Sequence, residues 1–583
     1  MKALRGWRLH ALGALLATGY VALLLGTAPD LGMARDESFY VTAAEHYAPW
    51  WQLLATRPSE ALTQTAIERH WSYNHEHPGL LKSLFALSHL AQTHWHIFKH
   101  DSSAHRFPGM LSAGLLLWLL FVFGNALMGW QAGLVAALSF ALVPRVFYHS
   151  HLNCFDVPIT LLLLWCAYCY WRSLKERRYV VWLGVAFGCA LSSKHNSWIL
   201  PGIFTIHHLW RAWWRRCHRR PTADDAAPRP SRTDLRPWWL LSMLTLGPLI
   251  FVLTWPWLWF EPWEHLRWYV RFHLQHDYYN IAYWGKTHFA PPFPWHYPVV
   301  MTAFTVPGMT LLLAFVGFVA RWPALWRSLG WRWPRWLWAC DQRPVRLRAW
   351  RRVSRPVRTL PQAADPRAFD VLWLGMTVAP ILLIALPSTP IFGGTKHWFP
   401  AYPFLCLYAA YGWRQAVVWA QASGSLPWPR LLCALSAALL LLPSALQTAH
   451  SHPFALSQYT PLAGGVAGGA DKGMHRQYWG FTTRSLTAWL DRHLPPGSRV
   501  WTSDTTWGAW TMLQRDGHLR ADLVQAPSMV DADVILVHHE RHFFAEEVQA
   551  WALLQQVHPA HVLTHQGVPI VSVYARASAL RRH

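Results

Sequence analysis

Long apolar segments separated by polar loops dominate the chain. A helix needs about 20 mostly apolar residues to cross the ~30 Å hydrocarbon core of a bilayer. About eleven segments approach that length, at residues 9–28, 108–128, 131–148, 157–170, 179–191, 198–210, 238–258, 298–320, 370–386, 399–420 and 431–446. The pattern predicts an all-α polytopic membrane bundle of about eleven transmembrane helices rather than a large soluble protein.

Arginine-rich loops alternate with loops that hold acids and histidines. Basic residues precede the first segment, and the linkers at 211–236 and 321–368 fall on the same side of the predicted membrane. The positive-inside rule assigns that side to the cytoplasm. We therefore expect a multi-pass protein of a bacterial inner membrane, with its long loop at 30–107 on the periplasmic side.

The composition agrees with this class. Only 14% of the residues are charged, against about 25% in soluble domains, and the 41 tryptophans suit membrane–water interfaces. The net charge of +23 is explained by the cytoplasmic loops, so we expect no nucleic-acid partner. The eight cysteines lie in or beside apolar segments or in the basic loops, and none follows residue 449, so we expect neither a disulfide framework nor a thiolate metal site.

Two domains are expected. Residues 1–448 form the membrane domain, whose long outer loop contributes amphipathic helices at 39–54 and 79–90 along the interface. Residues 449–583 contain no membrane segment and should form a small extracytoplasmic α/β domain. Its predicted helices and strands lie at 482–493, 499–501, 507–515, 534–538, 543–558 and near 562 and 571. The glycine-rich piece at 462–473 should be a loop, because no GK[ST] sequence or preceding strand supports a phosphate-binding role.

Carboxylates at the outer ends of the membrane segments are the first catalytic candidates. Asp36 and Glu37 follow the first segment, and Asp156 opens the fourth. Two carboxylates at one depth suit deprotonation of an acceptor hydroxyl and orientation of a substrate. The alternative is structural: the first two would be loop acids at a helix end, and Asp156 would be an N-cap.

Cations occur at the same predicted depth. Lys194 lies in SSKHN, Lys396 and His397 lie in TKHWFP, and Arg145 lies near the outer end of the third segment. As a group they would bind a lipid-linked phosphate. Alone, each could instead reach the lipid headgroups from a helix end.

The first outer loop adds polar candidates. His75 and Glu76 in the sequence HEHP could hold a divalent metal ion, although the spacing matches no zinc signature. The alternative is a polar interfacial loop in which His77 positions substrate. Tyr40 and Arg106 are further substrate-positioning candidates, and Arg106 could also anchor the loop or meet an acid.

Several short motifs, in order along residues 7–446, resemble one known family. They are RDESFY at 35–40, HPGLLK at 77–82, RFPG at 106–109, FYHSHLNCFDVP at 147–158, SSKHN at 192–196 and TKHWFPAYPF at 395–404. The chain resembles the polytopic GT-C glycosyltransferases, in particular glycosyltransferase family 39 and the protein O-mannosyltransferase-like group. It is also similar to the aminoarabinose transferases of lipid A.

The resemblance implies a sugar donor linked through phosphate to a polyprenol, an outer-face active site and inversion at the anomeric carbon. By position it assigns roles to Asp36 (base), Asp156 (second acid), Lys194 (donor phosphate), Lys396 and His397 (positive charge) and Glu76 (near the metal position of some relatives). Where relatives carry a KG pattern this chain has KHN, and the C-terminal domain lies outside the shared core.

The expected activity is transfer of a hexose or pentose from a polyprenyl-phosphate donor to an acceptor hydroxyl. The acceptor could be a protein, a lipid or a polysaccharide, and a divalent metal ion is the one cofactor considered. The alternative is a transporter or flippase of lipid-linked sugars. Transporters, however, usually keep their polar groups at the midplane on broken helices, whereas here they cluster at the outer ends.

Overall fold

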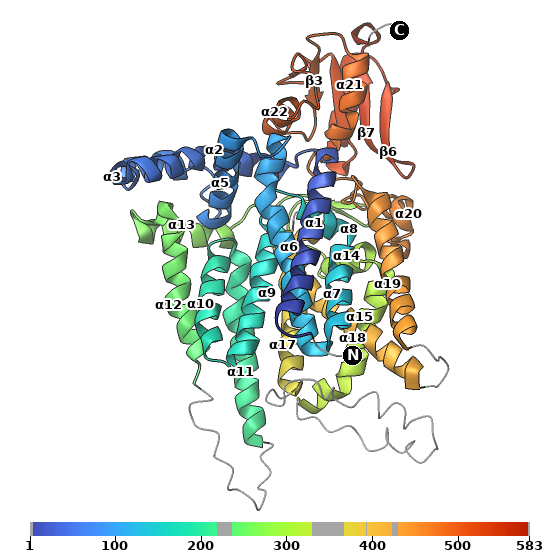
Figure 1. Cartoon of the computed structure of the whole chain (residues 1–583). Coiled ribbons are helices and arrows are strands. Elements are labelled where there is room, and N and C mark those ends of the chain that lie inside the picture. The colour runs from blue at the N-terminus through green and yellow to red at the C-terminus, as the bar shows by residue number, and fades with distance from the viewer. Residues whose placement is uncertain (1–3, 218–235, 329–365, 392, 423–428, 581–583) are drawn as a thin grey trace, which may run out of the picture.

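The computed structural model shows a helical bundle with a small sheet domain above it (Figure 1). It describes residues 4–217, 236–328, 366–391, 393–422 and 429–580. Much of the two predicted cytoplasmic linkers, at 211–236 and 321–368, lies outside the described residues. The predicted fold class is confirmed in its main feature, a mostly helical chain with a small sheet domain.

The bundle contains most of the long apolar helices. They are α1 (Trp7–Thr27), α6 (Asp101–Met128), α7 (Trp130–Ala141), α8 (Pro144–Ser150), α9 (Asp156–Ser173), α10 (Arg178–Leu191), α11 (Leu200–Cys217), α12 (Trp238–Leu253), α14 (Tyr297–Thr305), α15 (Gly308–Ser328), α17 (Pro366–Ala385), α18 (Tyr402–Ala422) and α19 (Pro429–Ser451). Among the described residues, three helices are long and apolar enough to cross a membrane, or up to five if each of two bent pairs forms one span. The count of about eleven stays a prediction.

Two predicted spans are broken where they were expected to be continuous. The segment at 131–148 bends by 78° between α7 and α8, and the segment at 298–320 bends by 119° between α14 and α15. A proline follows each break, and proline disfavours helical backbone at the residue before it. Val143 and Val306 accordingly have extended backbone, directly before Pro144 and Pro307.

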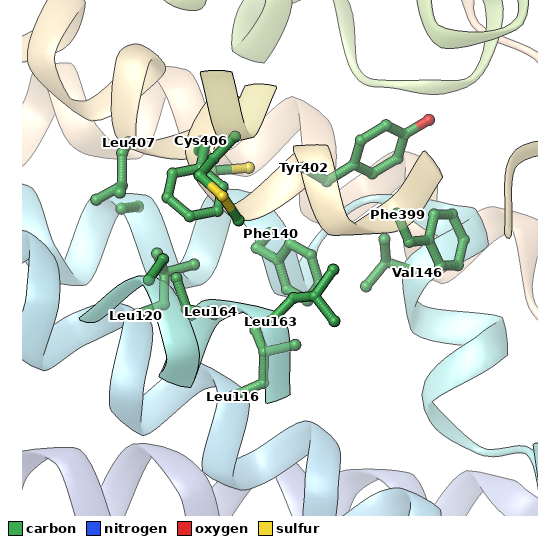
Figure 2. Packing of buried hydrophobic residues seen from close by; sticks show 14 of the residues in the cluster. Leu116, Leu120, Phe140, Val146, Leu163, Leu164, Phe399, Tyr402, Cys406 and Leu407 are labelled. Atoms are coloured by element: carbon green, nitrogen blue, oxygen red, sulfur yellow. The ribbon is translucent and has the colours of Figure 1, made fainter. Parts of the chain in front are cut away.

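One apolar core is shared by helices from the early and the late parts of the chain (Figure 2). It includes Leu116 and Leu120 of α6, Phe140 of α7, Val146 of α8, Leu163 and Leu164 of α9, Phe399 of η6 (Gly394–Ala401), and Tyr402, Cys406 and Leu407 of α18. Because protein interiors are close-packed, this core fixes η6 against α8 and α9. Candidate cations and a candidate acid are therefore held near one another.

The first outer loop forms several helices, and the longest of them runs crosswise to the bundle in Figure 1. They are α2 (Arg35–Thr56), α3 (Pro58–Ala61), α4 (Gln64–Trp71) and α5 (Gly79–Trp95), and α1 is followed by the short turn η1 (Ala28–Asp30). The two predicted amphipathic helices are present and longer than expected. Further short elements at this level are η2 (His195–Ile199), η4 (Pro256–Leu258), α13 (Pro262–Leu274), β1 (Ile281–Tyr283) and β2 (Lys286–His288).

The C-terminal sheet has five strands in the order β4-β3-β5-β7-β6. Strand β3 is parallel to β4 and β5, whereas β7 is antiparallel to β5 and β6. The strands are β3 (Arg499–Thr502), β4 (Val524–Gln525), β5 (Val534–His538), β6 (His561–His565) and β7 (Val568–Ala575), and the helical elements are η8 (Phe481–Leu486), α21 (Thr487–His493), α22 (Trp507–Arg515), η9 (Arg541–Phe543), α23 (Phe544–Leu554) and η10 (Ala577–Ala579). The predicted strand and helix positions recur, while the two-residue β4 was missed.

The stretch before the sheet domain packs into the bundle. Tyr459, Ala463 and Met474 belong to the bundle core, whereas the separate core of the sheet domain begins with Leu486. The glycine-rich piece that was expected to be a loop contains η7 (Pro461–Ala463) and the short helix α20 (Gly465–Asp471). This stretch consequently brings its last residues to the level of the first outer loop.

Candidate active site

A cavity of about 810 Å³ lies where the outer loops, the bundle and the C-terminal domain meet. The predicted site residues that line it are Asp36, Tyr40, Glu76, His77, Lys194, Lys396 and His397. Lining residues from the C-terminal domain and the stretch before it include His475, Tyr478, Trp479, Glu540 and His542. A mostly apolar pocket with a few convergent charged groups is the usual form of a ligand site.

Asp36 lies in the first turn of α2 and forms an ion pair with Lys396, which also lines the cavity. Its Oδ2 accepts a hydrogen bond of 2.7 Å from Lys396 Nζ, and 28% of the Asp36 side chain is exposed. Among the described residues, Oδ1 has no hydrogen-bond partner. The carboxylate therefore keeps one oxygen available toward the cavity.

Lys396 is buried under an aromatic ring. Its Nζ lies 4.5 Å from the ring centroid of Trp479, a cation–π contact that favours the charged amine. Burial lowers the pKa of Lys396, but Asp36 and Asp156 raise it, and the net shift is upward. The ammonium stays protonated at neutral pH and lies within the fields of both carboxylates.

A second ion pair lies beside the first. Lys194 Nζ donates a hydrogen bond of 2.7 Å to Asp156 Oδ1, and His149 Nδ1 lies 3.7 Å from Asp156 Oδ2. Lys194 lines the cavity, whereas Asp156 lies behind it at the start of α9. Because Lys396 also acts on Asp156, the two lysines and two carboxylates form one electrostatic network.

Glu37 lies outside this cavity. Its side chain is fully buried, and its oxygens accept hydrogen bonds from Arg106 Nε (2.8 Å) and Nη2 (2.9 Å) and from the backbone N–H groups of Ala34 and Asn153. Arg106 also donates to the backbone carbonyl groups of Ala28, Leu31 and Gly32, which follow α1. The pair ties α2 to α6 and to the loop before α9, and Arg106 lies outside the cavity as well.

Two other predicted residues are held away from the cavity. Arg145 lies between aromatic rings, with its guanidinium carbon 5.2 Å from the centroid of Tyr459 and 5.5 Å from that of Tyr478. His75 stacks on Trp257 with the ring centroids 4.6 Å apart. Neither residue lines the cavity, so of the predicted metal pair only Glu76 does.

Three cavity histidines suit a divalent metal ion chemically: the ring centroid of His273 lies 6.1 Å from that of His77 and 4.1 Å from that of His195. Burial lowers the pKa of His77, of His195 and of His273 (to about 4 for His273), so these imidazoles are neutral at pH 7. His273 Nε2 lies 3.0 Å from the carbonyl oxygen of Glu76, and the Nδ1 atoms of all three are buried without a hydrogen-bond partner. Neutral imidazole and carboxylate are common ligands of zinc.

The C-terminal domain contributes acids that the sequence did not point to. Asp504 forms an ion pair with Arg35, which directly precedes Asp36. Glu540 lines the cavity and accepts a hydrogen bond of 2.6 Å from Gln477. Burial, together with the nearby charge of Asp504, raises the pKa of Glu540 well above its usual range. The protonated form of Glu540 is therefore favoured over the form it has in water.

Residues 82–224 match the family model described as dolichyl-phosphate-mannose-protein mannosyltransferase. The predicted family is confirmed over this segment. The mannosyltransferase-like segment includes Arg145, Asp156 and Lys194, while Asp36 precedes it and Lys396 follows it. Half of the charged network thus belongs to the matched part of the chain.

The chain is also similar to solved structures. ArnT from Cupriavidus metallidurans in the apo state has 13% sequence identity and a TM-score of 0.44, with 97% of this chain and 99% of that chain covered. The same protein bound to undecaprenyl phosphate has 12% identity, the same coverage and a TM-score of 0.43. The archaeal oligosaccharyltransferase AglB from Archaeoglobus fulgidus, in complex with an inhibitory peptide and a dolichol-phosphate, has 11% identity, coverage of 94% and 71%, and a TM-score of 0.45. No curated protein matches the chain in sequence.

Proposed function

We propose that the protein is a membrane glycosyltransferase that moves a sugar from a polyprenyl-phosphate donor to an acceptor hydroxyl on the extracytoplasmic face. The observation that carries this proposal is the paired network of Asp36–Lys396 and Asp156–Lys194 at one cavity. A phosphate donor needs cations, and a hydroxyl acceptor needs a base. The match of residues 82–224 to a family named for a lipid-phosphate sugar donor supports the same chemistry.

In the proposed reaction, Asp36 takes the proton of the acceptor hydroxyl. The acceptor oxygen forms a bond to the anomeric carbon as the bond from that carbon to the phosphate oxygen breaks. The electron pair leaves with the polyprenyl phosphate, and a single in-line displacement inverts the anomeric configuration. General-base assistance of this kind contributes about 10²–10⁴-fold.

The two lysines act on the leaving group. Lys396 and Lys194 would stabilise the charge that develops on the phosphate oxygen as it departs. Their carboxylate partners keep the two ammonium groups charged and oriented until the donor binds. Since polyprenyl phosphate is a stable anion, the departing oxygen requires no general acid. A divalent ion bound at Glu76 would add positive charge for the phosphate.

The test is release of labelled sugar by the purified protein in lipid vesicles. Undecaprenyl-phosphate mannose, glucose and aminoarabinose serve as donors, and Asp30→Asn, an exposed acid outside the cavity, serves as the matched control. We expect release from at least one donor by the wild type and the control. Movement of intact donor across the vesicle membrane without any release would instead identify a transporter and overturn the proposal.

A further inference from the structure

A second group of ligating side chains lies away from the cavity, where α2, α5 and α6 meet. Glu45, His89 and His105 come from these three helices, and one ligand atom of each lies within 4.8 Å of the others. His105 Nε2 is 4.0 Å from Glu45 Oε1, and the His89 and His105 rings stack with centroids 4.7 Å apart. None of the three lines the cavity.

His105 has an unusual environment. Its side chain is fully buried, and neither ring nitrogen has a hydrogen-bond partner among the described residues. A neutral imidazole carries one donor and one acceptor, and burying either without a partner destabilises the folded state. A fully buried histidine whose two ring nitrogens have no protein partner, facing a carboxylate and a second imidazole, has the surroundings of a metal ligand.

Glu45 is oriented by the C-terminal domain. Arg515 of α22 donates a hydrogen bond of 2.7 Å to Glu45 Oε1 and one of 3.0 Å to Asp101 Oδ2. Glu45 Oε2 has no hydrogen-bond partner among the residues that the structure describes. The oxygen that Arg515 holds, Oε1, is also the one that faces His105, and carboxylates that ligate metal ions are typically hydrogen-bonded to an outer partner.

We propose that Glu45, His89 and His105 bind a divalent transition-metal ion of the zinc type. Two imidazoles and one carboxylate form a donor set that zinc uses, and imidazole favours zinc, copper and nickel over magnesium and calcium. Metal–ligand distances near 2.0–2.1 Å require ligand atoms about 3.3 Å apart, so small side-chain rotations would close the site.

The ion would join parts of the protein that meet above the bundle. Glu45 lies on the same helix as Asp36, so a metal bridge from α2 to α6 would fix the helix that presents the catalytic candidate. Arg515 extends the same connection to the C-terminal domain. The inferred site is therefore structural, and it stands independently of the proposed transfer reaction.

A neighbouring group offers a useful comparison. His100, Asp516 and His518 also lie within 4.8 Å of one another. Their atoms, however, are partly engaged: Asp516 Oδ1 accepts a hydrogen bond from the backbone N–H of Ser102, and His100 Nδ1 lies 3.2 Å from the Asp516 carbonyl oxygen. We therefore favour the first group, and Asp516→Asn becomes a control.

The experiment is a metal titration of the full-length protein, purified with a tag that contains no histidine and stripped with a chelator. Cobalt(II) binding is followed by visible absorption, and bound zinc is counted by elemental analysis after gel filtration. We expect His89→Gln and Glu45→Gln to bind one equivalent fewer than the wild type, with more than about 100-fold loss of affinity for that equivalent. Arg515→Gln, which removes only the outer partner, should lose about 10- to 100-fold.

Three matched variants should keep that equivalent: His94→Gln on the exposed face of α5, Glu76→Gln in the cavity, and Asp516→Asn. Zinc should also raise the thermal midpoint of the wild type by more than that of His89→Gln, because a ligand stabilises the state that binds it. The proposal is overturned if the wild type binds no metal, if His89→Gln and Glu45→Gln bind as the wild type does, or if the equivalent disappears with Asp516→Asn. His89 and Glu45 are only half-buried, so their variants should fold even if His105→Gln does not.

Discussion

Asp36 and Glu37 are neighbours in one helical turn, yet they meet opposite surroundings. Glu37 is fully buried, and both of its oxygens are engaged by Arg106 and by backbone N–H groups. Asp36 keeps 28% of its side chain exposed, with one oxygen on Lys396 and the other directed to no protein donor that the structure describes. Successive side chains of a helix point about 100° apart, so Asp36 can face the cavity while Glu37 faces the protein interior.

This difference assigns a chemical role to Asp36 and a structural role to Glu37. A base must have an oxygen that can accept a proton from the substrate, and Asp36 retains one. Both oxygens of Glu37 already accept hydrogen bonds that hold α2 against α6. Replacing Asp36 should therefore lower the rate of sugar transfer, whereas replacing Glu37 should lower stability. The following variants test that contrast and the groups around it.

The largest effect is expected for Asp36→Asn. The amide cannot take the acceptor proton, so the rate of sugar transfer should fall by about 10²–10⁴-fold. The thermal midpoint should change less than for Glu37→Ala, because 28% of the Asp36 side chain is exposed and Asp156 still acts on the charge of Lys396. Initial rates with labelled donor measure the effect, and Asp30→Asn should transfer at the wild-type rate.

Glu37→Ala should act on folding. Removing one partner of a buried ion pair costs about 3–5 kcal/mol, because the remaining charge stays buried without compensation. The thermal midpoint in detergent should drop sharply, and Arg106→Ala should behave alike. Normal stability with lost transfer in the folded fraction would reverse the roles given to the two acids.

Lys396→Gln should weaken binding of the lipid carrier. Hydrogen bonds to charged groups contribute about 1.5–3 kcal/mol, so the affinity for undecaprenyl phosphate should fall by about 10- to 100-fold. Titration of the purified protein with this lipid measures the change. Lys286→Gln, an exposed lysine outside the cavity, is the control, and equal affinities for both variants would remove Lys396 from the phosphate site.

Glu540→Gln should produce the smallest effect, visible as a pH dependence. The pKa of Glu540 is raised by burial and by Asp504, so above the usual value of about 4.3 the folded state binds more protons than the unfolded state. The contribution of Glu540 to stability is therefore present at low pH and is lost as the pH rises toward the raised pKa. Glutamine is neutral throughout this range.

The thermal midpoint of Glu540→Gln minus that of the wild type should consequently increase as the pH rises from 4.5 to neutrality. Glu68→Gln, which changes an exposed acid, should give a difference that does not vary with pH. A constant difference for Glu540→Gln as well would contradict the assignment of a buried proton to this carboxyl group.

Local patterns in the sequence predicted the helical class, the interfacial helices and the strands of the tail. They did not predict the bends before Pro144 and Pro307, because apolar composition alone hides a break in backbone hydrogen bonding. They also grouped Asp36 with Glu37, because the predicted helix began at residue 39, after both acids, whereas α2 begins at Arg35. Trp479 and Glu540 could not be found this way, because only the folded chain brings them beside a helix more than 400 residues earlier.

The central claim is that Asp36 serves the chemical step while the lysines hold the lipid phosphate. The most direct test measures sugar release and undecaprenyl phosphate affinity on the same preparation of Asp36→Asn. We predict that release is lost while the affinity stays within a few-fold of the wild type. Release at the wild-type rate, or a loss of lipid binding that accounts for the whole loss of rate, would contradict the claim.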